Sequence, residues 1–176
     1  MNILGVDIST STIGITILNE KKELIYWTYL KPRGNTLLQK VDSITNNIEE
    51  LFKSYKIDKI ICETPSISFN PGQSSAQVLA IILRFNGIIH YLLNLYSGLE
   101  INEIMASSAR KRVTGRGTYP SGTAKIQIFK WLQKTYTIPE SFPRKKMGKN
   151  KGEYANECYD ICDAWIIALS SFYDYK

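Results

Sequence analysis

Four acidic residues in apolar surroundings are the strongest chemical signal in this sequence of 176 residues. Asp7 and Glu63 each follow a short run of buried character, in NILGVD and KIICE. Asp160 and Asp163 are three residues apart in ANECYDICDAWIIAL, which places them on one face of a predicted helix. Neither has a Lys or Arg three or four residues further on. Because buried carboxylates are costly unless a cation neutralises them, the set predicts a metal site.

The distribution of basic residues indicates what such a site would act on. Residues 106–151 contain twelve Lys or Arg and one acid, Glu140, so their local net charge is +11. The whole chain carries +6, so the remaining residues sum to −5. This asymmetry predicts a polyanionic partner. Carboxylates around Mg²⁺ beside a positive surface fit phosphodiester hydrolysis, in which metal activates water and the basic surface holds the backbone.

Each of these features has a competing interpretation. The Asp7 carboxylate would instead cap the backbone of the Ser/Thr turn that follows it. Asp160 and Asp163 would lie on a solvated helix face, and residues 106–151 would be a solvated basic segment. Residues 2–18 also resemble the phosphate or metal hairpin shared by actin-like ATPases and ribonuclease H-like nucleases. An actin-like ATPase needs two lobes around its nucleotide, and 176 residues suffice for one.

An α/β domain would position the acids. Apolar and β-branched runs predict three antiparallel strands, followed by helices that alternate with two more strands. If neighbouring strands are parallel, Asp7 and Glu63 lie at the same edge of the sheet. The predicted elements are a hairpin over 2–18, a strand over 24–30, a helix over 36–55, a strand over 58–62, a helix over 75–96, a strand over 101–105, a basic loop over 106–122, a helix over 124–136, a second basic loop over 137–152 and a helix over 154–172.

Composition predicts one soluble domain over residues 1–176. Hydrophobic residues make up 44% and charged residues 22% of the chain. Polar residues interrupt the apolar stretch over 76–95, which argues against a membrane span, and no secretory signal is expected at the N-terminus. We therefore expect a cytoplasmic protein in which Cys62, Cys158 and Cys162 are buried free thiols rather than a disulfide or zinc site.

Three motifs together resemble the RuvC family of Holliday-junction resolvases. These are LGVDIS in the first hairpin, ICE at the end of a strand, and DxxDA ahead of IAL in the last helix. The order βββαβαβα is also similar to the ribonuclease H-like fold of that family, an α/β fold with a five-stranded mixed sheet flanked by helices. The resemblance implies a homodimer, joined through the helix of about residues 75–96, that makes paired symmetric nicks in four-way DNA junctions. The compact size is similar to that of a phage-encoded member acting in a bacterial host.

The same resemblance assigns roles to individual residues. Asp7, Glu63, Asp160 and Asp163 become catalytic acids that hold two Mg²⁺ ions, with Mn²⁺ as a substitute. Lys111 and Lys125 resemble the family's lysines near the scissile phosphate, although Arg110 and Arg112 leave the first assignment open by one residue. Phe69 is a candidate for stacking on an unpaired base, or for a core or interface contact. The residues expected to contact DNA are Phe69, Arg110, Lys111, Arg112, Arg116, Lys125, Arg144, Lys145, Lys146, Lys149 and Lys151.

Two other functions remain open at this point. One is a non-catalytic protein that binds branched nucleic acid on the same fold, against which the four intact acids argue. The other is a ribonuclease H-like enzyme acting on RNA–DNA hybrids or on pre-ribosomal RNA. His90 is expected to be a residue of its helix rather than a base, and whether Asn156 or Glu157 assists metal binding stays open.

Overall fold

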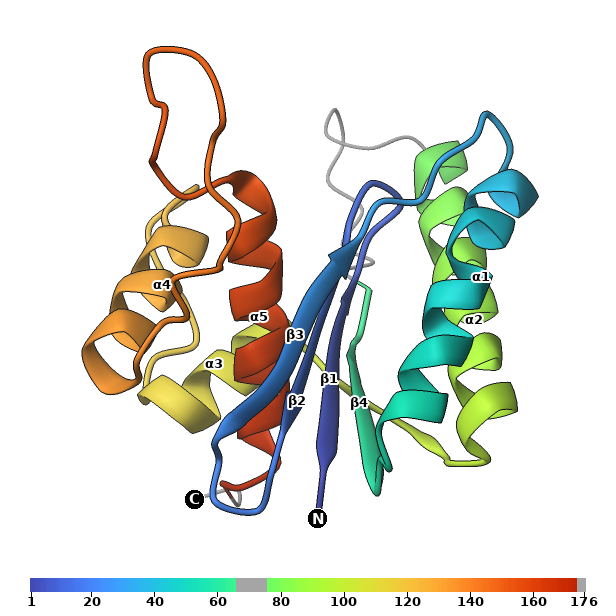
Figure 1. Ribbon diagram of the computed structural model, residues 1–176, viewed down its shortest axis with the longest axis horizontal. Helices are drawn as coiled ribbons and strands as arrows, with labels where there is room; N and C mark the ends of the chain where they lie inside the picture. Colours follow the sequence, from blue (N-terminus) through green and yellow to red (C-terminus); the bar gives the residue numbers. More distant parts are fainter. Residues whose placement is uncertain (66–75, 174–176) are drawn as a thin grey trace.

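A five-stranded sheet covered by helices on both faces makes up the protein (Figure 1). The structure is a computed structural model and describes residues 1–65 and 76–173. Its elements are β1 (Ile3–Ile8), β2 (Ile13–Leu18), β3 (Leu24–Leu30), α1 (Leu37–Ser54), β4 (Lys59–Glu63), α2 (Ala76–Ser97), β5 (Ile101–Ile104), α3 (Ala106–Thr114), α4 (Ala124–Thr135) and α5 (Asn156–Ser170).

The strand order brings two of the acids to one edge of the sheet. The strands lie in the order β3-β2-β1-β4-β5, with β1, β2 and β3 antiparallel and with β1, β4 and β5 parallel. Val6 pairs with Cys62, and the next residue of each strand is Asp7 or Glu63. The two carboxylates therefore stand side by side at the carboxyl ends of parallel strands, which confirms the predicted sheet and its consequence.

Strand alternation decides which face the acids point to. Successive side chains of a strand point to opposite faces, so Ile3, Gly5 and Asp7 share one face of β1. Ile3 belongs to the core that α5 covers, whereas Leu4 and Val6 belong to the core beneath α1 and α2. By the same rule Glu63 shares the α5 face of β4 with Ile61, which is also part of the α5 core. Both strand acids therefore face the helix that carries the other two.

Two glycines allow α5 to lie directly on the sheet. A Cβ atom at Gly5 would stand 2.2 Å from the carbonyl oxygen of Ala164, and one at Gly14 would stand 2.2 Å from that of Asp160. Gly14 also pairs with Asp7 across the first hairpin. Any side chain at these positions would push the helix away from the strands. The glycines thus set the distance between the acids of β1 and those of α5.

One predicted element is wrong. Residues 106–122 were expected to be a basic loop, but the first half forms helix α3. Ala and the long basic side chains of ASSARKRVT are good helix formers. Ala109 and Val113 are buried in the core around α5. The helix ends at Gly115, whose φ of 78° is the left-handed conformation typical of a glycine cap.

The structure confirms the expectation about the cysteines and shows how helix α2 is buried. Cys62, Cys158 and Cys162 are free and buried, as predicted. Helix α2 is long and apolar enough to pass a length and composition test for a membrane span. Its inner side, however, is a core face that packs on the sheet with Phe85 and Ile89. The helix also exposes large apolar residues: Val78, Ile81, Leu83, Tyr91 and Leu95.

Candidate active site

Three of the four predicted acids line one cavity. Asp7 from β1, Glu63 from β4 and Asp163 from α5 surround a space of about 300 Å³ at the carboxyl edge of the sheet. Arg110 of α3 and Lys125 of α4 line the same space. We call this the carboxylate pocket. Elements far apart in the sequence build it, and three acids outnumber two cations within it.

The fourth acid, Asp160, stands at the rim of the carboxylate pocket. It precedes Asp163 by nearly one helical turn and is half-buried, whereas Asp163 is only 4% exposed. From Ile161 to Ser170 every residue of α5 is buried, because the sheet lies on one side and α3 and α4 lie on the other. The packing fixes the helix, and with it the positions of both acids.

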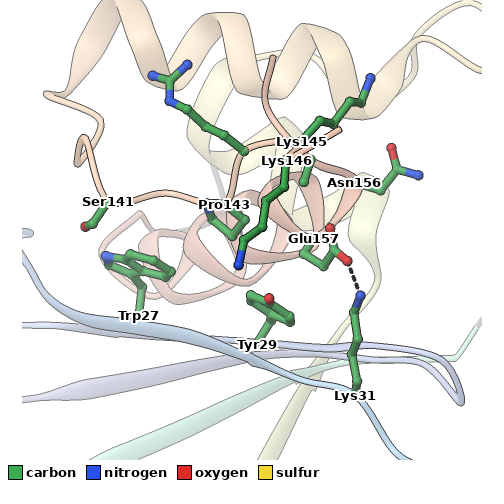
Figure 2. Close-up of a pocket in the computed structure, with 11 residues that line it drawn as sticks. Trp27, Tyr29, Lys31, Ser141, Pro143, Lys145, Lys146, Asn156 and Glu157 are labelled. Atoms are coloured by element: carbon green, nitrogen blue, oxygen red, sulfur yellow. Dashed lines mark ion pairs between the residues drawn. The ribbon is translucent and has the colours of Figure 1, made fainter. Parts of the chain in front are cut away.

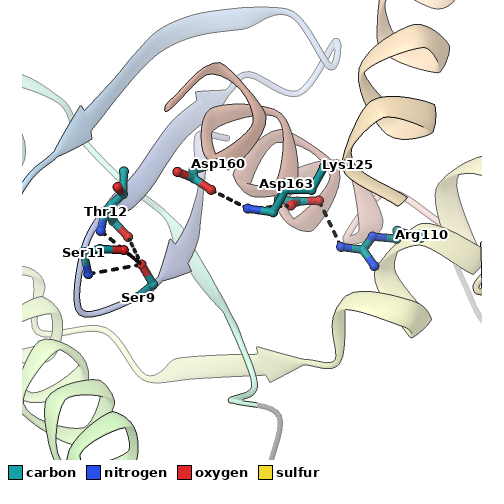
Figure 3. Close-up of polar contacts among 7 residues, drawn as sticks. All are labelled: Ser9, Ser11, Thr12, Arg110, Lys125, Asp160 and Asp163. Carbon is teal, nitrogen blue, oxygen red and sulfur yellow. Dashed lines mark hydrogen bonds and ion pairs between the residues drawn. The ribbon is translucent and has the colours of Figure 1, made fainter. Parts of the chain in front are cut away.

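Two cations contact the acids of α5 (Figure 3). A guanidinium nitrogen of Arg110 donates a hydrogen bond to Oδ1 of Asp163 at 3.2 Å. The ammonium group of Lys125 donates to Oδ1 of Asp160 and lies 3.7 Å from Oδ2 of Asp163. Helix α3 supplies Arg110, and the first turn of α4 supplies Lys125. Helix α3, which was expected to be a loop, therefore completes the pocket.

Burial and mutual repulsion make it costly for the pocket acids to be charged together. Burial raises the pKa of Asp7 well above its ordinary value, and the charges of Glu63 and Asp163 raise it further. Burial likewise raises the pKa of Glu63, with Asp163 adding to the effect. The pKa of Asp163 is raised by burial even though Arg110 opposes the shift. The two protein cations thus leave the carboxylates short of positive charge.

The chemistry of these donors fits a hard divalent cation. They are carboxylate oxygens, which Mg²⁺ and Mn²⁺ prefer, and a bound cation would remove the repulsion that raises their pKa values. Within residues 1–65 and 76–173, no three His, Cys, Asp or Glu side chains already stand as ligands of one ion. Asp160 and Asp163 are turned to Lys125 and Arg110.

The turn after β1 is closed without Asp7. The Ser9 hydroxyl accepts a hydrogen bond from the backbone N–H of Thr12 at 3.0 Å and donates one to the Thr12 carbonyl at 2.7 Å (Figure 3). Ser9 therefore plays the capping role that the competing interpretation gave to Asp7. The Asp7 carboxylate lines the carboxylate pocket instead.

The predicted lysine pair is only partly brought together. Lys125 contacts the acids, but Lys111 is exposed on α3 and does not line the carboxylate pocket. Its neighbour Arg110 lies beside Asp163 instead, and which of the two residues acts near the scissile phosphate stays a prediction. The helical phase of α3 was the missing signal, because it turns Arg110 toward α5 together with Val113.

The other predicted DNA contacts among the described residues do not line the carboxylate pocket. Arg112 is half-buried, and Arg116 donates to the Thr118 carbonyl at 2.9 Å. Phe69 lies outside the described residues. His90 pairs with Glu103 of β5 at 3.2 Å, in keeping with its expected place as a residue of its helix.

The second basic loop forms a projecting hairpin (Figure 1). The backbone N–H of Lys145 donates to Glu153, and that of Ala155 donates to Pro143. We call residues 143–155 the basic hairpin. Arg144 and Lys145 brace it through bonds to Gly152 and Glu153, whereas the remaining basic residues, Lys146, Lys149 and Lys151, are exposed.

Comparison with known sequences gives full-length relatives of a single kind. No protein-family model matches the chain. A crossover junction endodeoxyribonuclease RuvC of Ehrlichia ruminantium is 24% identical, over 100% of this chain and 99% of its own length. The RuvC of Campylobacter concisus is 25% identical, over 97% of this chain and 95% of its own length.

Solved structures agree with the fold. Thermus thermophilus RuvC, in a complex with Holliday junction substrate, superposes with a TM-score of 0.67 at 13% identity, covering 97% of this chain and 92% of that one. The Fowlpox virus resolvase, in a complex with Holliday junction DNA, gives a TM-score of 0.53 at 17% identity, covering 97% and 96%. At these identities the likeness concerns the fold.

Sheet order and acids together define a class of protein. A five-stranded mixed sheet of this order, with acids on β1, β4 and the last helix, is a ribonuclease H-like fold with a carboxylate site. The full-length relatives narrow the class further. The chain is similar over its full length to RuvC proteins, at 24–25% identity. The phage origin stays a prediction.

Proposed function

We propose that this protein is a metal-dependent endonuclease that resolves four-way DNA junctions by paired symmetric nicks. One observation carries the proposal: Asp7, Glu63 and Asp163 converge on one cavity from three separate elements. The names of the full-length relatives, crossover junction endodeoxyribonuclease, support the reaction. The two structural neighbours were solved with Holliday junction DNA, which supports the substrate.

In this proposal the acids hold the metal. Asp7 and Glu63 on the strands, with Asp163 and Asp160 on α5, would bind two Mg²⁺ ions, and Mn²⁺ would substitute. Bound metal supplies an activated water and stabilises the leaving oxygen. Asp7 is central to the set because it stands between Glu63 and the α5 acids, whose charges all raise its pKa.

The cations have separate tasks. Lys125 lies within reach of both α5 acids and is 48% exposed, so its ammonium group is available to a phosphate that approaches the pocket and would neutralise charge that develops there. Arg110 is half-buried beside Asp163 and would position that carboxylate. The other predicted basic side chains would hold the DNA backbone: Lys111, Arg112, Arg116, Arg144, Lys145, Lys146, Lys149 and Lys151.

Paired nicks require two active sites, and α2 offers a surface for a second copy. Its outer face exposes Ile81, Tyr91 and Leu95, more apolar surface than a solvated helix needs. We propose a homodimer of single-domain chains joined there. Phe69, outside the described residues, stays a candidate for stacking on an unpaired base or for a core or interface contact. The free cysteines support a reducing compartment such as the cytoplasm.

Two rivals make different predictions. A non-catalytic binding protein on this fold would have no need for acids whose burial raises their pKa. A ribonuclease H-like enzyme would prefer an RNA–DNA hybrid. Neither has a specific observation in its favour beyond the shared fold.

Cleavage of defined substrates separates all three. A labelled synthetic four-way junction, a linear duplex and an RNA–DNA hybrid are incubated with the protein in Mg²⁺ and then in EDTA. Symmetric nicks in the junction that disappear in EDTA are expected. Tight junction binding without cleavage in any divalent metal would instead favour the binding protein, and cleavage of the hybrid alone would favour the ribonuclease.

A further inference from the structure

A second cavity, larger than the carboxylate pocket, lies between β3 and the basic hairpin (Figure 2). Its volume is about 630 Å³. We call it the basic groove. The first turn of α5 forms its inner wall, so it begins within about one helical turn of Asp160. Its lining residues include Trp27, Tyr29, Lys31, Lys146, Asn156 and Glu157.

The floor of the basic groove is aromatic and fixed. Trp27, Tyr29 and Lys31 alternate along the chain and therefore point to the same face at the end of β3. The Trp27 ring packs edge-on against buried Phe142, with centroids 4.7 Å apart. Trp27 and Tyr29 are half-buried, so each is held by the core on one side and open to the groove on the other. Fixed, half-open aromatic rings are suited to stacking with a nucleobase.

The rim of the basic groove is cationic. Lys146 points into the groove above Tyr29, whereas Lys145 turns away to pair with Glu153 (Figure 2). Lys31, at the other side, forms an ion pair with Glu157 that holds its ammonium group at the mouth. Two ammonium groups over an aromatic floor match the alternating phosphates and bases of a nucleic acid strand.

The position of the groove identifies which part of a DNA substrate it can take. Asn156 and Glu157 line the groove, while Asp160 and Asp163 follow on the same helix toward the carboxylate pocket. A strand whose scissile phosphate lies among the acids would continue along α5 into the groove. A base can stack on the floor only when it is unpaired, because base pairing buries its faces within the duplex.

We propose that the basic groove holds an unpaired stretch of the cleaved strand next to the scissile phosphate. A base stacks on Tyr29 and Trp27, and flanking phosphates bind Lys31 and Lys146. The groove then selects branched DNA that opens near its crossover over DNA that stays fully paired. This inference rests on the proposed nuclease function and adds to it a site that determines selectivity.

The test compares two double variants that each remove two lysines. K31Q/K146Q removes both lysines from the rim of the groove. K53Q/K56Q is the control and removes two exposed lysines at the end of α1. The pairs are matched because Lys53, like Lys31, forms an ion pair on the surface. Both are titrated in EDTA, which prevents cleavage, against a fully paired four-way junction and against one with three unpaired thymidines at the crossover. Dissociation constants come from fluorescence anisotropy.

The largest loss of affinity is expected for K31Q/K146Q on the junction with unpaired bases. K31Q/K146Q binds the junction with unpaired bases about fivefold or more weakly than wild type and loses less on the paired junction. K53Q/K56Q binds both junctions as wild type does. Equal losses on both junctions would overturn the inference, because the groove would then contact duplex backbone. Equal affinities of K31Q/K146Q and K53Q/K56Q would overturn it as well.

Stacking has its own readout. A 2-aminopurine placed among the unpaired bases is quenched when it stacks on an aromatic ring, so wild type should quench it and Tyr29→Leu should not. Circular dichroism checks the fold of this variant, and the lysine pair decides the matter if Tyr29→Leu is unfolded. Failure of wild type to bind any junction would count against the proposed nuclease function itself. Binding and cleavage that are unaffected by every groove variant would count against the groove alone.

Discussion

The carboxylate pocket and the basic groove flank the same end of α5 but are built in opposite ways. In the pocket, acids are buried against the sheet and Asp163 is only 4% exposed. In the groove, Lys146 is exposed on a hairpin and the cavity has twice the volume, about 630 Å³ against about 300 Å³. The pocket concentrates negative charge at a fixed geometry, and the groove offers positive charge on a broad surface.

The difference indicates that catalysis and DNA recognition use separate regions of the molecule. Metal-assisted hydrolysis needs ligands held within a few tenths of an ångström, which only core packing provides. Backbone binding tolerates movement because it depends on charge and stacking. Variants in the pocket should therefore abolish cleavage and spare binding. Variants in the groove should weaken binding of junctions with unpaired bases and leave the single-turnover cleavage rate at saturation unchanged.

Glu63→Gln tests the pocket side with the largest expected effect. It removes a negative ligand while keeping the size of the side chain, so cleavage of a four-way junction in Mg²⁺ should fall by more than about 100-fold. Junction affinity measured in EDTA should stay within about twofold of wild type. Glu50→Gln, on the exposed side of α1, is the matched control and should cleave normally.

Neighbouring residues Arg110 and Lys111 sharpen the comparison within a single helix. Arg110 bonds Asp163 and is 17% exposed at its side chain, whereas Lys111 points to solvent. Arg110→Gln should slow single-turnover cleavage by about 10–100-fold, as expected when a partner that orients a metal ligand is lost. Lys111→Gln should change affinity by severalfold or less and leave the single-turnover rate at saturation unchanged. The opposite order would return Lys111 to the catalytic role that the sequence motif suggested.

Gly14→Ala tests the spacing of α5 from the sheet. The new Cβ would stand 2.2 Å from the Asp160 carbonyl, so the helix must shift. Overpacking of this kind costs about 1–3 kcal/mol, which lowers the melting temperature by about 2–4 °C per kcal/mol. Gly87→Ala is the control, since a Cβ there meets nothing within 4 Å in the chain. Equal melting temperatures for the two variants would show that α5 does not press on the first hairpin.

The pH dependence of stability gives a smaller effect with a definite sign. The pKa of Asp7 is raised in the folded protein, so folding favours its neutral form. As pH rises from the ordinary value of 3.8 through the raised one, the metal-free protein loses stability because it must carry a buried charge. Asp7→Asn should therefore melt a few degrees above wild type at pH 7 in EDTA, and the difference should vanish near pH 3. Thermal melts across this range, with Mg²⁺ added last to stabilise wild type only, check the sign.

The sequence predicted the strands, and the positions of Asp7 and Glu63 at strand ends, because both depend on local patterns. β-branched runs and an acid at the end of a strand are visible without tertiary structure, and β1 and β4 lie where those patterns placed them. Helix α3 was missed because its basic surface resembles a loop and its burial, through Ala109 and Val113, depends on α5. That Arg110 rather than Lys111 lies beside Asp163 follows from the same helix, so it could not be predicted either.

The basic groove could not be predicted for a related reason. Trp27 and Lys146 are 119 positions apart and meet only because α5 lies on the sheet. The alternation of Trp27, Tyr29 and Lys31 on one strand face was the available signal, but aromatic residues in a strand most often pack in a core. A local pattern shows what a side chain can do, whereas its partner comes from the fold.

Asp7→Asn tests the central claim most directly. The variant and wild type are compared at enzyme concentrations that saturate a labelled four-way junction, with binding measured in EDTA and single-turnover cleavage measured in Mg²⁺. We expect Asp7→Asn to bind the junction with the affinity of wild type and to cleave it more than about 100-fold more slowly. Normal cleavage by Asp7→Asn would contradict it, and a parallel loss of binding and folding would mean that Asp7 serves the structure rather than the reaction.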